Sequence, residues 1–250
     1  MLTADFGMID DEIGSTSFGG PRFLQAFVGG FPTTAFTVSL KVRSTSPGML
    51  ISLGDDETGS VDWTQARFSI DIWSQSVTVG FGQTRGVVVS LATNLLDGAT
   101  HHLAVTWSQS AAGANGATVV VYVDGRQVGQ RSWVFTDDGV EPGFIPRIIA
   151  SGPLFIGYRP AQHNELQPSG IFAGALRDLR VWARVMTPAE VASDQTAVVA
   201  GTEPGLYLSL PLDPASRDYP SNRFVDQSPN RFEALEIVIQ DNAVSMGSVW

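Results

Sequence analysis

Short runs of alternating apolar and polar residues fill most of this chain, and each run stops at Gly, Pro, Asn or Asp. The clearest is residues 36–43, where Phe36, Val38, Leu40 and Val42 occupy every second position. Successive side chains of a strand point to opposite faces, so this pattern predicts a half-buried strand with those side chains on the core face. Further runs predict strands at residues 49–53, 67–73, 77–81, 87–91, 127–135, 153–157, 172–182, 206–210 and 234–239.

Residues 101–123 predict two adjacent strands that end at an Asp-Gly turn. Alternation along the first strand places His101 on the same face as Leu103 and Trp107, which points inward, and His102 on the outward face. We interpret both histidines as framework residues that pair with their neighbours in the sheet. A zinc site is the less favoured reading of this pair.

One segment carries the signals of a helix. Thr187 is placed as N-cap, Pro188 takes the first helical position, and Glu190 completes a capping box. We expect about two turns, over residues 187–196. Residues 1–34 are predicted to be irregular, apart from an edge strand near Phe6.

About a dozen short strands and one short helix favour an all-β fold, a sandwich of two antiparallel sheets. No shift in composition marks a domain boundary, so we expect a single domain over residues 1–250. In this reading residues 1–34 form an irregular N-terminal extension, and residues 202–250 supply C-terminal strands that complete the sandwich.

The composition excludes several classes of function. A net charge of −10 argues against nucleic acid and anionic membrane surfaces, because both are bound through basic faces. The chain has no cysteine, which rules out disulfides, thiolate metal sites and cysteine nucleophiles. No apolar run is long enough for membrane insertion, and the first twenty residues carry no secretory signal.

Several motifs follow one another in a recognisable order. They are residues 36–38, Asp97-Gly98 before residues 101–107, residues 121–125, residues 154–157, and residues 172–182 followed by Arg184, Thr187-Pro188 and Glu190. From residue 36 to about 235 the chain therefore resembles the laminin G-like jelly rolls and their pentraxin relatives, in the concanavalin A-like lectin/glucanase superfamily. The resemblance implies a two-sheet antiparallel jelly-roll sandwich and favours an extracellular or cell-surface role, such as cell adhesion.

An enzymatic activity is not expected. A glycosidase needs two carboxylates across a cleft, and glucanases of this superfamily place theirs in an acidic alternating motif on one strand. The nearest run here, residues 69–74, holds Asp71 without a second acid. The Arg, His and Tyr cluster of a polysaccharide lyase is not formed by Arg67 and His101.

Calcium is the candidate cofactor, since it prefers carboxylate, amide and carbonyl oxygens supplied by loops. In pentraxins one ligand loop follows an early strand and a second follows a Leu-x-x-Gly strand end. The acidic triplet that pentraxins place after this glycine is replaced here by Arg159-Pro160-Ala161. Solvated loop acids remain the alternative, and a rival cluster holds Asp137, Asp138 and Glu141. The resemblance predicts as metal ligands Asp55, Asp56, Glu57, Gln162, Asn164 and Glu165.

Carbohydrate recognition needs an exposed aromatic ring beside planar polar groups. Trp63 and Trp73 lie near the first acidic loop, and Tyr158 and His163 lie near the second. We predict these residues as ligand-binding. The remaining tryptophans of strand runs are assigned to the core or to strand packing: Trp107, Trp133 and Trp182.

Two functions from different classes remain open. The first is a non-enzymatic, lectin-like module that binds a glycan or glycoprotein, with calcium as a candidate requirement. The second is a structural or adhesion protein that assembles through its sandwich faces and takes no small ligand. Such a homo-oligomer would use outward residues Trp73, Val88, Val120 and Tyr122.

Overall fold

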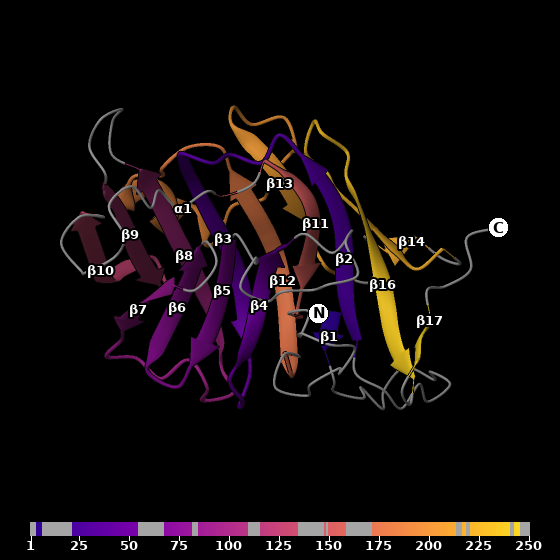
Figure 1. The fold of residues 1–250 in the computed structure, drawn as a ribbon, viewed down its shortest axis with the longest axis horizontal. Coiled ribbons are helices and arrows are strands. Elements are labelled where there is room, and N and C mark those ends of the chain that lie inside the picture. The colour runs from indigo at the N-terminus through magenta and orange to yellow at the C-terminus, as the bar shows by residue number, and fades with distance from the viewer. Residues whose placement is uncertain are drawn as a thin grey trace.

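The alternating runs form the strands of two stacked antiparallel sheets (Figure 1). The computed structural model of the chain describes residues 4–6, 22–54, 68–81, 85–109, 116–134, 148, 150–158, 172–213, 217–218, 221–240 and 243–245. Within these ranges the single helix has seven residues, and no helix is long and apolar enough to cross a membrane. The predicted all-β sandwich with one short helix is confirmed.

One sheet has seven strands in the described part of the chain. Across it lie, in order, β1 (Ala4–Phe6), β12 (Gly174–Trp182), β3 (Ala35–Arg43), β8 (Thr100–Gln109), β9 (Gly116–Val123) and β10 (Arg126–Val134). β13 (Leu206–Leu210) also pairs with β12. The predicted edge strand near Phe6 is therefore present as β1.

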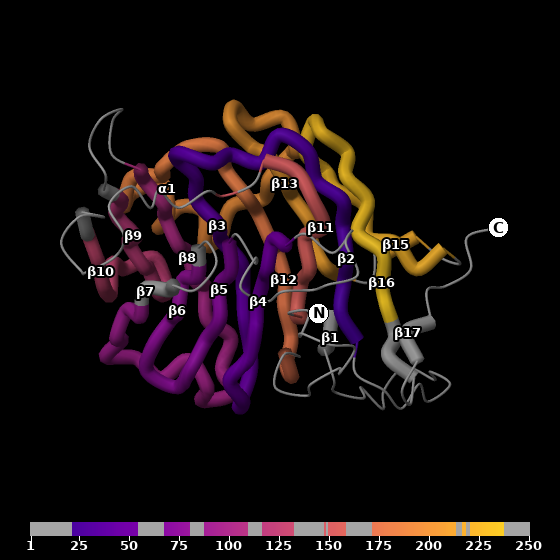
Figure 2. The backbone as a smooth tube through the Cα atoms, viewed as in Figure 1, coloured from indigo at the N-terminus to yellow at the C-terminus, as the bar shows by residue number. Residues whose placement is uncertain are grey.

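The other sheet has ten strands among the described residues. Its order is β14 (Arg217–Asp218), β15 (Arg223–Val225), β16 (Glu233–Gln240), β2 (Arg22–Gly29), β11 (Ser151–Ile156), β4 (Gly48–Leu53), β5 (Phe68–Trp73), β6 (Ser76–Phe81) and β7 (Arg85–Ser90). β17 (Ala243–Ser245) pairs with β16. Figure 2 shows that β2, β11 and β16, which are far apart in sequence, lie side by side.

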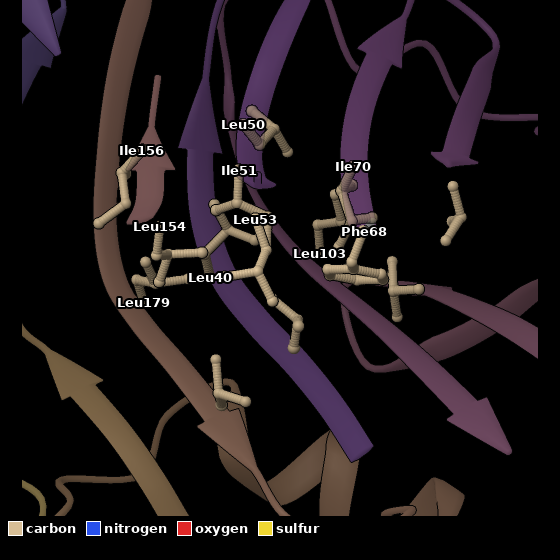
Figure 3. Close-up of a cluster of buried hydrophobic side chains, with 14 of the residues drawn as sticks. Leu40, Leu50, Ile51, Leu53, Phe68, Ile70, Leu103, Leu154, Ile156 and Leu179 are labelled. Atoms are coloured by element: carbon tan, nitrogen blue, oxygen red, sulfur yellow. The ribbon is translucent and has the colours of Figure 1, made fainter. Parts of the chain in front are cut away.

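The core fills the space between the two sheets. Phe36, Val38, Leu40 and Val42 of β3 are at most 1% exposed, so the predicted core face is confirmed. Figure 3 shows side chains of β3 and β8 gathered with those of β4, β5 and β11 in one cluster. Each fully buried Leu, Ile or Phe contributes about 1.5–3 kcal/mol, so this layer supplies the main stabilisation of the fold.

The prediction of an irregular N-terminus was wrong for residues 22–29, which form β2 near the middle of the ten-stranded sheet. Leu24 and Ala26 face the core, as expected of a strand. Phe23, on the opposite face, is also buried, because it packs against Phe155 of β11. With both faces apolar, the segment has no alternation to read.

The helix covers the outer face of the seven-stranded sheet. α1 (Pro188–Asp194) has Thr187 as N-cap and the complete capping box with Glu190, as the sequence predicts. It ends two residues earlier than expected. Its buried Val191 joins a cluster with Ala104 and Tyr122, which point outward from β8 and β9.

Asp194, the last residue of α1, ties the helix to the sheet. Its carboxylate accepts a hydrogen bond from Ser39 Oγ at 2.7 Å and forms an ion pair with Arg180 Nη1 at 2.8 Å. His102 Nε2 lies 3.4 Å from the same carboxylate, so this histidine points outward, as predicted, and is buried beneath the helix. Burial raises the pKa of Asp194, but the hydrogen bond from His102 and the charge of Arg180 outweigh it and leave the pKa below its ordinary value.

A buried carboxylate also accepts a hydrogen bond from the backbone at the edge of β13. Asp226 is fully buried, and its oxygens accept hydrogen bonds from the backbone N–H groups of Ser209 and Phe232. Ser228 Oγ and Asn230 Nδ2 each donate to the carbonyl of Tyr207. These side chains, together with the backbone N–H of Gln227 that donates to Ser209 O, take the place of a neighbouring strand on this side of β13.

The prediction that the four assembly residues share one outward face was wrong. Trp73 and Val88 lie on the outer face of the ten-stranded sheet and are half exposed. Val120 and Tyr122 belong to β9 of the other sheet, where Tyr122 is buried beneath α1. The pairs therefore lie on opposite outer faces of the sandwich.

We expect Asp194→Ala to lower the free energy of unfolding by about 3–5 kcal/mol, because the Arg180 charge is left buried without its partner. The folded-state pKa of Asp194 is lowered, so its contribution is present above the unfolded pKa of about 3.9 and is lost as the pH falls. Urea unfolding at pH 7 and at pH 3 measures both effects.

Glu190→Ala, in the same helix, serves as the control. Its ion pair with Arg184 is solvent-exposed, and its capping-box bonds to Thr187 are worth about 1 kcal/mol, so the loss of stability is expected to be smaller than in Asp194→Ala. Equal losses in the two variants would show that the buried pair does not anchor the helix.

Candidate functional site

An exposed indole stands at the end of β5 on the outer face of the ten-stranded sheet. Phe68, Ile70 and Ile72 point into the core and are fully buried, as the sequence predicts. The alternation therefore turns Asp71 and Trp73 outward. Trp73 is 52% exposed, which is unusual for so large an apolar side chain.

The ring of Trp73 is held in place by its own strand. Its Nε1 donates a hydrogen bond to Asp71 Oδ1 at 2.9 Å, two residues back on the same face. This bond uses the edge of the indole and leaves the flat faces of the ring unaffected. The indole is therefore oriented while half of it stays in solvent.

Strand pairing surrounds Trp73 with small polar side chains. Across β6 and β7, Trp73 lies opposite Ser76 and then Ser90, and Asp71 lies opposite Thr78 and then Val88. All of these positions are at least partly exposed. We refer to this group as the Trp73 surface; its members are Asp71, Trp73, Ser76, Thr78, Val88 and Ser90.

A loop after β7 supports the turn that follows Trp73. Leu91 N donates to Gln75 O at 2.8 Å, and Leu95 N donates to Ser74 O at 3.0 Å. Leu95 is fully buried in the main core. Both carbonyl groups of the turn between β5 and β6 are therefore hydrogen-bonded to this loop, which supports the turn beside Trp73.

This arrangement suits the binding of a sugar ring. An aromatic face packs against the C–H face of a sugar, and nearby hydroxyl and carboxylate oxygens bond to its hydroxyl groups. Trp73 offers the face, Val88 extends the apolar area, and Ser76, Thr78 and Asp71 offer the polar groups. The strand pairing that brings these residues together has no signature in the sequence.

Of the other predicted ligand-binding residues, the structure describes Tyr158. Its ring stacks on Phe23 with 4.3 Å between ring centroids and meets Phe155 edge-on, and it is 6% exposed. The ring of Tyr158 therefore packs against Phe23 and Phe155 and is not part of the Trp73 surface. The core assignment of Trp107 and Trp182 is confirmed by their burial.

The remaining predicted site residues lie outside the described ranges. These are Trp63 and His163, the predicted metal ligands Asp55, Asp56, Glu57, Gln162, Asn164 and Glu165, and the rival acids Asp137, Asp138 and Glu141. Within the described ranges no group of three or more His, Asp or Glu side chains is arranged to hold a metal ion. The calcium site stays a prediction.

The two antiparallel sheets and the order of their strands form a β-sandwich of the laminin G type. Residues 19–192 match the family model Laminin_G_3, described as the concanavalin A-like lectin/glucanases superfamily, and the chain belongs to this family. The resemblance inferred from the motifs is confirmed. No curated protein matches the sequence.

Solved structures share the fold at low sequence identity. A heptameric SAP-like pentraxin from Limulus polyphemus is 17% identical, with a TM-score of 0.52 over 75% of this chain and 78% of that one. A candidate carbohydrate-binding protein from Bacteroides ovatus is 15% identical, with a TM-score of 0.57 over 98% of this chain and 60% of that one. Domains LG4-5 of the mouse laminin alpha1 chain are 18% identical, with a TM-score of 0.45 over 78% and 44%.

We expect Trp73→Ala to lower the free energy of unfolding by about 1 kcal/mol or less, because a half-exposed side chain on a sheet face supports little packing. The control is Trp107→Ala, which removes a fully buried indole and should cost about 3–5 kcal/mol. Urea denaturation of both variants measures the difference. A large loss in Trp73→Ala would mean that this indole is structural.

Proposed function

We propose that this chain is a non-enzymatic, lectin-like module that binds carbohydrate at the Trp73 surface. The observation that carries the proposal is the exposed indole of Trp73, which is hydrogen-bonded to Asp71 and flanked on one side by the hydroxyl residues of β6 and β7. Membership of a family described by lectins and glucanases supports it. The Bacteroides ovatus protein, which shares the fold, is named as a candidate carbohydrate-binding protein.

A binding role fits this surface better than hydrolysis. A glycosidase of the usual type places two carboxyl groups about 5–9.5 Å apart across the scissile bond. The Trp73 surface holds one carboxyl group, that of Asp71, which is engaged with the indole. The glycan is therefore expected to be released unchanged.

The partner we propose is a glycan or glycoprotein outside the cell, in keeping with a sandwich of this family. We retain calcium as a proposed requirement on the grounds of the loop residues Asp55, Asp56 and Glu57, because carboxylate-rich loops are natural calcium ligands.

A second candidate, assembly into a homo-oligomer, is favoured by two exposed apolar side chains at the far side of the same sheet. Phe27 is 61% exposed and Val225 is 43% exposed. The register of β15, β16, β2 and β11 places them in one row with Glu233 and Pro153. Light scattering of the unaltered chain and of Phe27→Glu tests it; an oligomer that dissociates in the variant would support assembly through this row.

The carbohydrate proposal predicts binding on a glycan array that is lost in Trp73→Ala. Losing the stacking face should weaken binding at least tenfold, which corresponds to about 1.4 kcal/mol. Phe27→Ala is the matched control, since it removes another exposed aromatic side chain from the same sheet. Absence of binding to any glycan, with and without chelator, would overturn the proposal.

The calcium proposal predicts a rise in melting temperature on adding calcium and its reversal by a chelator. A ligand that binds only the native state adds about 2.7 kcal/mol at a hundredfold excess over its dissociation constant. The double variant Asp55→Asn, Asp56→Asn should lose this response, and Asp218→Asn, at the exposed end of β14, should keep it. An unaltered melting curve in calcium would exclude the site.

A further inference from the structure

His101 lies between two carboxylates that belong to different parts of the fold. Its Nδ1 is 2.9 Å from Asp124 Oδ2, and its Nε2 is 3.2 Å from Asp97 Oδ1. The imidazole is buried, while both carboxylates are half exposed. Both ring nitrogens therefore face an oxygen that accepts hydrogen bonds.

The chemistry of the ring fixes its charge in this arrangement. A neutral imidazole has one N–H, and an ionised carboxylate is an acceptor only. Two simultaneous hydrogen bonds to two carboxylates therefore require the imidazolium, which has two N–H groups. We infer that protonated His101 is a clamp that holds the Trp73 surface in place and makes glycan binding there pH-dependent, an inference that rests on the proposed function.

On one side the clamp holds the turn between β9 and β10. Asp124 accepts from His102 N through its other oxygen at 2.9 Å and has a positive φ of 50°. The next residue, Gly125, has a φ of 73° and lies so close to α1 that an added Cβ would sit 3.1 Å from Ala192 Cα. This side of the clamp is held independently of His101.

On the other side the clamp holds the loop that supports Trp73. Asp97 Oδ1 also accepts from Ala99 N at 2.7 Å, and Gly98 N donates to Ser44 O at 3.1 Å. Two residues before Asp97, the backbone N–H of Leu95 holds Ser74 O in the turn after Trp73. A shift at Asp97 is thus passed to the turn that carries the indole.

The surroundings of His101 favour its charged form. Burial acts to lower its pKa, but the hydrogen bond and charge of Asp124, and then those of Asp97, raise it above the ordinary value of 6.5. From β3 the residue opposite is the apolar Val42. Arg43, next along β3, lies opposite Thr100, and the alternation directs its side chain to the other face of the sheet.

The sign of the effect follows from the raised pKa. The clamp contributes fully below the unfolded-state pKa of about 6.5 and is lost as the pH rises through the folded-state pKa. Once the ring is neutral, one bond must break. The longer contact, to Asp97, is the weaker one, so the loop side is released.

The test is amide hydrogen exchange of the protein alone, with the titration of His101 followed by NMR in the same samples. We expect the protection factors of Leu95 and Leu91 to fall about tenfold as the pH rises through the His101 midpoint. In Asp97→Asn the amide oxygen can still accept from Ala99 N, but the charge is gone. Protection in this variant should therefore not follow the His101 titration.

Asp218→Asn removes a remote carboxylate, which accepts from Ser221 Oγ, and should keep the original pH profile. The clamp is overturned if the protection factors of the unaltered protein do not change with the His101 titration. It is also overturned if the protection factors of Asp97→Asn follow that titration as in the unaltered protein. With the strongest glycan of the array, the dissociation constant should rise over the same pH range, and Asp97→Asn should abolish this rise. Failure of every glycan to bind would overturn the proposed function while the exchange data still decide on the clamp.

Discussion

The two sheets of this protein share one core. Each strand that borders the core must therefore keep its apolar side chains on the core face along its whole length. A slip of one residue would turn the buried face of a strand toward solvent. The fully buried rows of β3, β5, β8 and β9 meet this condition together. The placement of everything on the outer faces follows from it, because each inward residue fixes where its two neighbours point.

The predictable part of the fold is the part where one face of a strand is apolar and the other polar. Residues 36–43 and 68–73 could be assigned from alternation alone, and the helix from its capping box at Thr187. β2 could not, because Phe23 and Leu24 are buried on opposite faces. On its outer face, Phe23 is covered by Phe155 and Tyr158, whose position depends on strand pairing between distant segments.

The candidate site was predictable to the same degree. Trp73 stands out as an aromatic residue at a strand end, and alternation turns it outward. Its tether to Asp71 follows from a spacing of two on one strand, but Ser76, Thr78 and Val88 join it only through the register of β5, β6 and β7. The role of His101 was hidden for the same reason. Asp97 lies only four residues before His101, but Asp124 meets the imidazole only through the pairing of β8 with β9.

The carboxylate of Asp226 has a consequence for how this protein meets its own copies. An open strand edge offers unpaired N–H and C=O groups to any other chain in extended form, which is a common route to aggregation. At β13 those groups already bond to Asp226, Gln227, Ser228 and Asn230, so an extended chain finds few free groups along this strand. Strand-to-strand pairing between copies is thereby disfavoured along β13.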